Sequence, residues 1–202
     1  MNIFYLSHKP SRCARWHCDK HVVKMILETA QLLYTAHWAT GQTNFETAPL
    51  RKGTSEHGYK SIRNKNHPSA IWTRESIEHY MWLCQLGEFL CSEYTYRYSK
   101  EHSCQKHIYW LAANPPGLGT GWRQPPQAMP EEYKKSNSVA AYRAYYLGAK
   151  SAFLSYKRRA RPHWIPKIWS CSTQNFLACQ PYKIYARTSC SLITRSHTHP
   201  IK

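Results

Sequence analysis

The chain has 202 residues, which suffices for one domain or one domain with a tail and excludes a multidomain machine. Hydrophobic residues make up 42% and aromatic residues 14% of it, so it can bury a core and does not belong to the disordered class. The formal net charge of +17 is unevenly placed: residues 133–202 hold 13 basic and no acidic side chains, and residues 1–132 hold all 11 acidic ones. This asymmetry predicts a polyanionic partner, with nucleic acid first and an anionic membrane surface second.

The membrane alternative has little support in the sequence. No apolar run approaches the ~18–20 residues that a spanning helix requires, and the N-terminus lacks the charged-then-apolar pattern of a secretion signal. We therefore expect a soluble protein of the cytoplasm that does not bind membranes. Its eight cysteines are expected to be free thiols, because disulfides are rare in that compartment.

The first helix is predicted from Ser11 to His37, after a short apolar start at residues 2–6. Within it, apolar residues recur at steps of three and four, which is the period of one buried helix face. The opposite stripe carries imidazole, amine, carboxylate and amide groups: His17, His21, Lys24, Glu28, Gln31 and Thr35.

Two further helices are predicted beyond the loop at residues 40–68. The second covers residues 69–98, and its apolar positions lie around much of its circumference, so it should occupy the middle of the fold. Residues 113–138 are rich in proline and glycine and predict an irregular surface connection. The third helix is expected over residues 139–157.

We therefore predict an all-α fold, a compact bundle of about three main helices with long irregular connections. Residues 1–158 are expected to form its single domain. Residues 159–202 are basic and lose all periodicity, which predicts a poorly ordered C-terminal extension.

Glu28 is the strongest candidate for chemistry. It is the only acidic residue between Asp19 and Glu46, and it stands one turn from Lys24. A lone carboxylate on a surface that faces phosphates opposes binding, which favours a role other than affinity. The alternative is an ordinary pair of Lys24 and Glu28 at four-residue spacing, which contributes a few tenths of a kcal/mol.

A second constellation would suit a structural zinc ion. Cys13, His17 and His21 share one face of the predicted helix, and Cys18 lies beside them. The spacing fits no common zinc finger or ribbon, and a fourth ligand would have to come from elsewhere. The main interpretation therefore includes no metal and no cofactor.

Aromatic and basic residues alternate near the ends of the second and third predicted helices. Basic side chains contact phosphates and flat rings stack on exposed bases, so this pattern favours DNA binding, although single tyrosines more often pack with polar tips. The candidate DNA contacts are Lys20, Lys24, Gln31, Arg74, Arg97, Lys100, Tyr142, Arg143, Tyr145, Tyr146 and Lys150. The sequence contains no phosphate-cradling glycine loop, no Gly-x-Ser-x-Gly elbow and no Cys-x-x-Cys pair, which argues against P-loop nucleotide hydrolysis and serine hydrolase chemistry.

Several segments resemble a set of small phage-encoded proteins. They are Met-Asn-Ile-Phe-Tyr-Leu at the start, His-Cys-Asp-Lys-His-Val-Val-Lys-Met-Ile-Leu-Glu-Thr-Ala-Gln from His17, Asn-His-Pro-Ser-Ala-Ile-Trp from Asn66 and Glu-Tyr-Thr-Tyr-Arg-Tyr from Glu93. This resemblance implies a phage- or virus-encoded protein that acts in the cytoplasm of the host cell.

More remotely, residues 1–150 resemble the pyrimidine-dimer DNA glycosylases, the phage endonuclease V family. In that family a histidine precedes the catalytic glutamate by seven residues, as His21 precedes Glu28 here, and a histidine ends the loop before a long central helix, as His67 does. A Pro-Gln segment with a nearby tyrosine and an aromatic-basic helix follow; they correspond to Pro126, Gln127 and Tyr133, and to Tyr142, Arg143, Tyr145, Tyr146 and Lys150.

The resemblance implies an all-helical, metal-free glycosylase and AP lyase that extrudes a base from damaged double-stranded DNA and acts as a monomer. The family's nucleophile is the α-amine exposed when the initiator methionine is removed. Here residue 2 is the bulky Asn2, which predicts that Met1 is retained and supplies the amine. Lys20 or Lys24 is the alternative nucleophile, and a hydrolytic glycosylase that uses no amine is a further alternative. Glu28 would stabilise positive charge on the sugar, with His21 beside it.

Two other functions remain open at this point. The first is a non-catalytic basic DNA-binding protein, with the zinc site described above as a structural element. The second is an enzyme that acts on free or modified nucleotides, which would explain the polar stripe but not the absence of acidic residues after Glu132.

Overall fold

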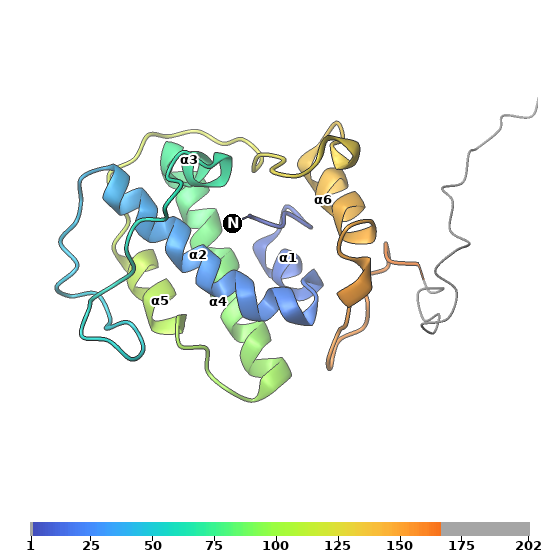
Figure 1. Cartoon of the computed structure of the whole chain (residues 1–202), viewed down its shortest axis with the longest axis horizontal. Helices are drawn as coiled ribbons and strands as arrows, with labels where there is room; N and C mark the ends of the chain where they lie inside the picture. Colours follow the sequence, from blue (N-terminus) through green and yellow to red (C-terminus); the bar gives the residue numbers. More distant parts are fainter. Residues whose placement is uncertain (1, 167–202) are drawn as a thin grey trace, which may run out of the picture. The chain divides into compact units, whose positions relative to one another are not determined.

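Six α-helices form the part of the chain that the computed structural model describes, residues 2–166 (Figure 1). They are α1 (Pro10–Trp16), α2 (Asp19–Ala39), α3 (Pro68–Glu75), α4 (Ile77–Tyr98), α5 (Gln105–Ala113) and α6 (Ser138–Leu147), with 3-10 turns at Glu131–Tyr133 and Ser151–Phe153. These residues contain no β-strand, and only two isolated bridges pair Leu50 with His57 and Ser76 with Gly119. The prediction of an all-α fold is confirmed.

The first predicted helix is in fact two helices, α1 and α2. The backbone is extended at His17 and Cys18, where ψ is 135° and 163°. The carbonyl groups of Arg15 and His17 accept hydrogen bonds from the Arg97 guanidinium, at 3.0 and 2.9 Å. A side chain from α4 therefore satisfies carbonyl groups that a continuous helix would have used itself.

The second predicted helix is also divided, into α3 and α4. Ser76 lies between them in an extended conformation, with φ −148° and ψ 157°. Its hydroxyl oxygen accepts the His79 N–H at 3.2 Å and so caps the N-terminus of α4. Pro68 occupies the first turn of α3, where its missing N–H costs nothing.

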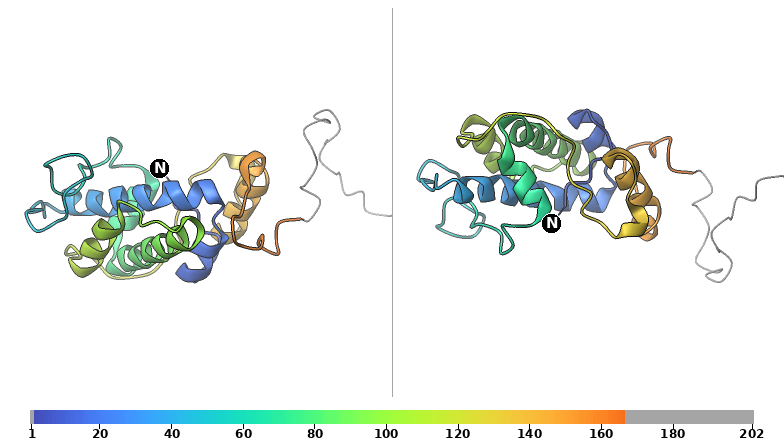
Figure 2. Two further views of the ribbon diagram at one scale, coloured as in Figure 1. Left: turned by 90° about the horizontal axis from the view of Figure 1, so that it is seen from below. Right: turned by 90° about the horizontal axis from the view of Figure 1, so that it is seen from above.

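Helix α4 occupies the middle of the fold, as its apolar pattern predicts. It packs against α1, α2, α3 and α5. Figure 2 shows α2 and α4 side by side in both views. The prediction of about three main helices is corrected at three points: two predicted helices are divided, α6 ends at Leu147, ten residues earlier than expected, and α5 was not predicted.

The N-terminal segment runs through the interior of the domain. Ile3, Tyr5 and Leu6 are at most 1% exposed, and the Tyr5 ring lies 5.0 Å from the Trp82 ring of α4. Phe4 stacks on His21 of α2, with 4.1 Å between the ring centroids. Because its side chains are apolar and aromatic, the segment is held by burial. Because residues 3–6 are buried, the preceding residue Asn2 is held against the domain and is itself partly buried.

The packed domain continues past the predicted boundary at residue 158 and ends at Ile165. Arg159 donates to Glu93 of α4 at 2.7 Å, and Ile165 is only 4% exposed. Residues 159–165 thus belong to the domain and not to the predicted extension. The remainder of that extension, residues 167–202, lies outside the described part of the chain.

Two glycines in the loop between α2 and α3 give a matched test of backbone strain and packing. Gly58 has φ +63°, and a Cβ there would lie 2.7 Å from Cε1 of the buried Tyr34. Gly53 has φ +75° and nothing within 4 Å of such a Cβ. We expect Gly58→Ala to lower the free energy of unfolding by about 2–4 kcal/mol and Gly53→Ala by about 1–2 kcal/mol. Urea denaturation measures both, and equal losses would contradict the close packing of Gly58 on Tyr34.

None of the helices in residues 2–166 combines the length and the apolar character that crossing a bilayer requires.

Candidate functional site

The backbone of Asn2 meets the Glu28 carboxylate. The Asn2 N–H donates to Glu28 Oε2 at 3.1 Å. The Asn2 side chain is fixed as well: its Oδ1 accepts the Tyr142 hydroxyl at 2.6 Å, and its Nδ2 donates to the Ala128 carbonyl at 2.8 Å. The backbone of Asn2 is therefore bound to α2, and its side chain is bound to α6 and to the segment before α6.

Glu28 is 8% exposed, although it belongs to the polar stripe of α2. Its Oε1 pairs with Lys24 Nζ at 3.1 Å, and that lysine side chain is 68% exposed. The two oxygens of the carboxylate thus have different partners: one pairs with an exposed ammonium group, and the other accepts the backbone N–H of Asn2. The simple surface pair considered from the sequence is present, but the carboxylate does more than pair with Lys24.

His67, at the N-terminus of α3, lies within electrostatic range of this carboxylate. Its Nδ1 accepts the Ser69 N–H at 3.2 Å, which places the proton of the neutral ring on Nε2. Burial lowers the pKa of His67, while the negative charge of Glu28 acts in the opposite direction. The loop before α3 therefore brings an imidazole into the electrostatic reach of Glu28.

The Pro-Gln segment borders the same site. The Tyr142 hydroxyl that holds Asn2 also lies 2.7 Å from the Pro126 carbonyl oxygen. The Gln127 side chain binds within its own loop: its Nε2 donates to the Lys135 carbonyl at 2.8 Å, and its Oε1 accepts the Lys135 N–H at 3.0 Å. This segment thus forms one wall of the site through its backbone.

His21 supports the site from within the core. Its Nδ1 hydrogen-bonds the Tyr146 hydroxyl, and its ring stacks on Phe4. Burial lowers the pKa of His21 to about 3, so the ring is neutral near pH 7. No hydrogen bond joins His21 to Glu28 within the described residues. His21 holds the N-terminal segment in place through Phe4 and Tyr146, and its role beside Glu28 stays a prediction.

Buried neutral histidines predict a loss of stability in mild acid. Burial lowers the pKa of His21 to about 3 and the pKa values of His17, His37 and His107 to about 4. Each takes up a proton on unfolding when the pH lies below its unfolded pKa near ~6.5, so stability is complete above that pH and is lost as the pH falls toward 4.

We expect the free energy of unfolding to fall on the order of 1 kcal/mol per pH unit for each of these histidines between pH 6.5 and 5. Thermal unfolding followed at pH 7.5, 6 and 5 measures this loss. A melting temperature unchanged across that range would show that the rings take up protons in the folded protein at the same pH as in the unfolded chain.

The predicted DNA contacts divide into three groups by exposure. Lys20, Lys24 and Lys100 are exposed; Gln31, Arg74, Arg143, Tyr145 and Lys150 are partly exposed; Arg97, Tyr142 and Tyr146 are buried. Within the second group, the Arg74 guanidinium is bound to the Lys65 carbonyl and Lys150 Nζ lies 4.7 Å from the Tyr145 ring centroid.

Three of these predictions are corrected by burial. The Arg97 guanidinium is 0% exposed and is bound by Asp19 and Glu93, at 3.0 and 3.1 Å, as well as by the two carbonyl groups at the end of α1. Tyr142 and Tyr146 are also 0% exposed, because α6 turns these rings toward the N-terminal segment. Arg97 is a structural residue, and the two tyrosines position Asn2 and His21.

The zinc alternative is not supported by the geometry of its residues. Residues 2–166 contain no group of three or more His, Cys, Asp or Glu side chains that could hold a metal ion. Cys13 Sγ donates to the Phe4 carbonyl at 3.2 Å, and His17 Nδ1 donates to the Cys13 carbonyl at 2.7 Å. The cysteines in this part of the chain, Cys13, Cys18, Cys84, Cys91 and Cys104, are free and buried, as predicted.

The predicted nucleophile Met1 lies outside the described residues. The residue that sequence reasoning did not place in the site is Asn2, which it treated only as a departure from a family pattern. A usable signal was present, since the apolar run at residues 3–6 predicts a buried start of the chain.

The chain matches no model of a known protein family, no curated protein and no solved structure. The functional assignment therefore depends on the chemistry of the site itself.

Proposed function

We propose that this protein is a DNA glycosylase and AP lyase that acts on pyrimidine dimers in damaged double-stranded DNA through an amine-derived imine. It needs no metal and acts as a monomer in the cytoplasm of a phage-infected host cell. The observation that carries the proposal is the hydrogen bond from the Asn2 N–H to Glu28 Oε2, at 3.1 Å. It holds Asn2 against the one carboxylate that the polar stripe of α2 contains.

The chemistry requires an unprotonated amine next to a carboxylate. A free α-amine has a pKa near ~7.7–8, so a useful fraction is unprotonated at neutral pH, whereas a lysine amine near ~10.4 needs a lowered pKa first. We assign the nucleophile to the α-amine of Met1, one peptide bond from the Asn2 amide. Lys24, which pairs with Glu28, is the alternative nucleophile.

The amine nitrogen forms a bond to the sugar C1′ as the glycosidic bond breaks, and the electron pair leaves with the base. The positive charge that develops on the sugar is stabilised by the Glu28 carboxylate. The departing base takes up the proton that the amine loses. The C1′–O4′ bond then opens as the nitrogen lone pair forms the C1′=N bond, and O4′ takes a proton from water. The resulting protonated imine acidifies C2′–H; Glu28 accepts that proton, and the 3′ phosphate leaves in a β-elimination. Duplex opening costs a few kcal/mol and least at a damaged step, so lesion recognition and base extrusion favour each other.

The experiment incubates the full chain with UV-irradiated or undamaged duplex in the presence of borohydride, followed by a denaturing gel. Reduction of the imine leaves a covalent adduct, which we expect only with irradiated DNA. Peptide mapping of the adduct identifies the amine and the residue that carries it. Salt-sensitive binding to both DNAs without adduct or cleavage would overturn the proposal and favour the non-catalytic DNA-binding protein. That alternative is supported by the 13 basic and no acidic residues after residue 132.

A further inference from the structure

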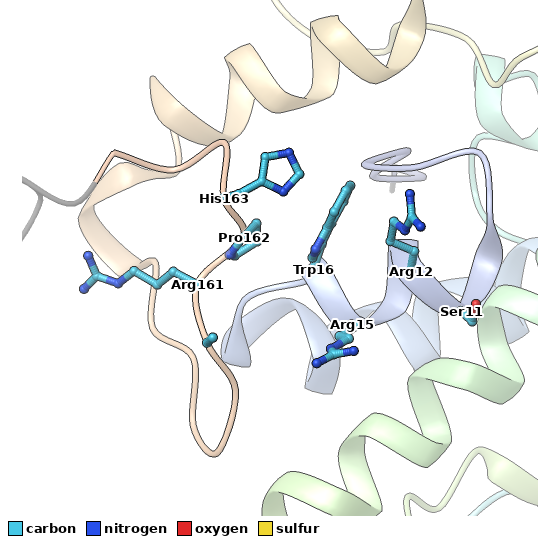
Figure 3. Close-up of a pocket in the computed structure, with 8 residues that line it drawn as sticks. Ser11, Arg12, Arg15, Trp16, Arg161, Pro162 and His163 are labelled. Carbon is cyan, nitrogen blue, oxygen red and sulfur yellow. The ribbon is translucent and has the colours of Figure 1, made fainter.

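A second site lies between α1 and the end of the domain, and none of the residues of the Glu28 site lines it. It is a cavity of about 370 Å³, referred to below as the arginine pocket. Figure 3 shows the side chains that define it: Arg12, Arg15 and Trp16 from α1, and Arg161, Pro162 and His163 from the segment after α6. No acidic residue of the described chain lines it.

Trp16 is the fixed centre of this pocket. The Arg143 guanidinium lies 4.9 Å from its ring centroid, and the Arg143 Nε donates to the Leu6 carbonyl at 3.1 Å. The His163 ring meets it edge-on with 5.5 Å between the centroids. Cation–π contacts hold guanidinium groups on the indole without neutralising their charge. The indole ring of Trp16 thus forms the floor of the pocket, and arginine side chains surround it.

The arginines of the pocket lack the partners that nearby arginines have. Arg159 binds both oxygens of Glu93, and Arg158 donates to the Tyr96 carbonyl at 3.1 Å. By contrast, the guanidinium groups of Arg12, Arg15 and Arg161 make no hydrogen bond and no ion pair with any residue of the described chain. Like charges gathered without acidic partners favour an anionic ligand.

The arrangement of the charges indicates what kind of anion. In Figure 3, Trp16 stands between Arg12 and Arg161, with Arg15 below it, and the three guanidinium groups point in different directions. They do not converge on one point, as a site for a single phosphate ion would require. A strand that presents consecutive phosphates matches charges spread in this way.

We infer that the arginine pocket binds the sugar–phosphate backbone of a DNA strand, with phosphates on Arg15 and Arg161 and with Trp16 and His163 beneath the strand. The inference takes its DNA partner from the proposed function but does not depend on imine chemistry. It extends the contact surface to residues 160–163, which sequence reasoning assigned to a poorly ordered tail.

The test uses the full chain and a labelled duplex titrated from roughly 50 to 300 mM salt. The double substitution Arg15→Gln and Arg161→Gln leaves the Arg12 and Arg143 contacts with Trp16 intact. We expect it to reduce the slope of log K against log salt by about 2 and to weaken binding about tenfold. The matched control is Lys52→Gln with Lys106→Gln. It removes the same charge from two exposed positions, in the loop before α3 and in α5, that form no ion pair within residues 2–166, and it should change the slope by less than about 0.5.

A second readout localises the contact. Bound DNA should protect Arg15 and Arg161 from an arginine-specific reagent, while the exposed Arg63 stays reactive in the same digest. Equal weakening by the two double variants, no weakening by either, or protection by inorganic phosphate but not by DNA would each overturn the inference. The Glu28→Gln variant separates the two proposals, because it should retain the full salt slope whether or not the unaltered chain cleaves DNA.

Discussion

Replacing Glu28 with glutamine is expected to reduce imine formation and strand cleavage on irradiated DNA by about 10²–10⁴-fold. Glutamine retains an oxygen that can accept the Asn2 N–H, so the N-terminal segment should remain in place. It lacks the negative charge that stabilises the sugar and the basicity that removes the C2′ proton. Single-turnover cleavage and borohydride trapping, measured at saturating protein, report this loss directly.

The matched control for this variant is Glu101→Gln, which removes an exposed carboxylate beyond α4. We expect the control to leave the rate of cleavage unchanged. DNA affinity should be equal or higher in Glu28→Gln, because one negative charge near the phosphates is gone. Cleavage at the unaltered rate in Glu28→Gln would remove this carboxylate from the mechanism, whatever amine forms the adduct.

The second large effect is expected at Arg97, where Arg97→Met should lower the free energy of unfolding by about 3–5 kcal/mol. Within residues 2–166, the substitution leaves Glu93, which is 7% exposed, with Arg159 as its one cationic partner, and it removes the donors to the carbonyl groups of Arg15 and His17. A buried charge or carbonyl group without a partner lowers the free energy of unfolding far more than an exposed ion pair raises it. Urea or guanidinium denaturation measures the change.

Arg158→Met serves as the control for Arg97→Met. Arg158 is exposed, and its guanidinium donates to the Tyr96 carbonyl and the Ser99 hydroxyl at 3.1 Å. Its replacement should cost less than about 1 kcal/mol. Similar losses in the two variants would mean that the Arg97 cluster does not hold α1, α2 and α4 together.

The helices were predictable from the sequence, and their interruptions were not. The three- and four-residue apolar periods of α2 and α4 correspond to buried faces in the structure. The break at His17 and Cys18 carries no glycine or proline, and it is stabilised by Arg97, about 80 residues further along the chain. A contact at that separation overrides local helix propensity and leaves no local signal. Ser76 could have been identified as a helix cap, but only with the preceding break known.

The candidate site was predictable in part. The pair of Lys24 and Glu28 follows from helix geometry alone, and the structure contains it. Asn2 and His67 reach this pair only through tertiary packing, so composition and spacing could not join them. The tyrosines of α6 were misjudged for a related reason: a short helix rich in both aromatic and basic residues has no unique apolar face, and its orientation depends on what it packs against.

The buried N-terminal segment also affects how the protein forms during synthesis. Asn2 and Phe4 are synthesised before the rest of the domain, but they have native partners in its last helix: Asn2 hydrogen-bonds Tyr142, and Phe4 packs against Tyr146. A nascent chain that ends before α6 keeps these apolar residues exposed and leaves Asn2 without its anchor. The contacts that hold Asn2 against Glu28 are therefore complete only after α6 has been translated.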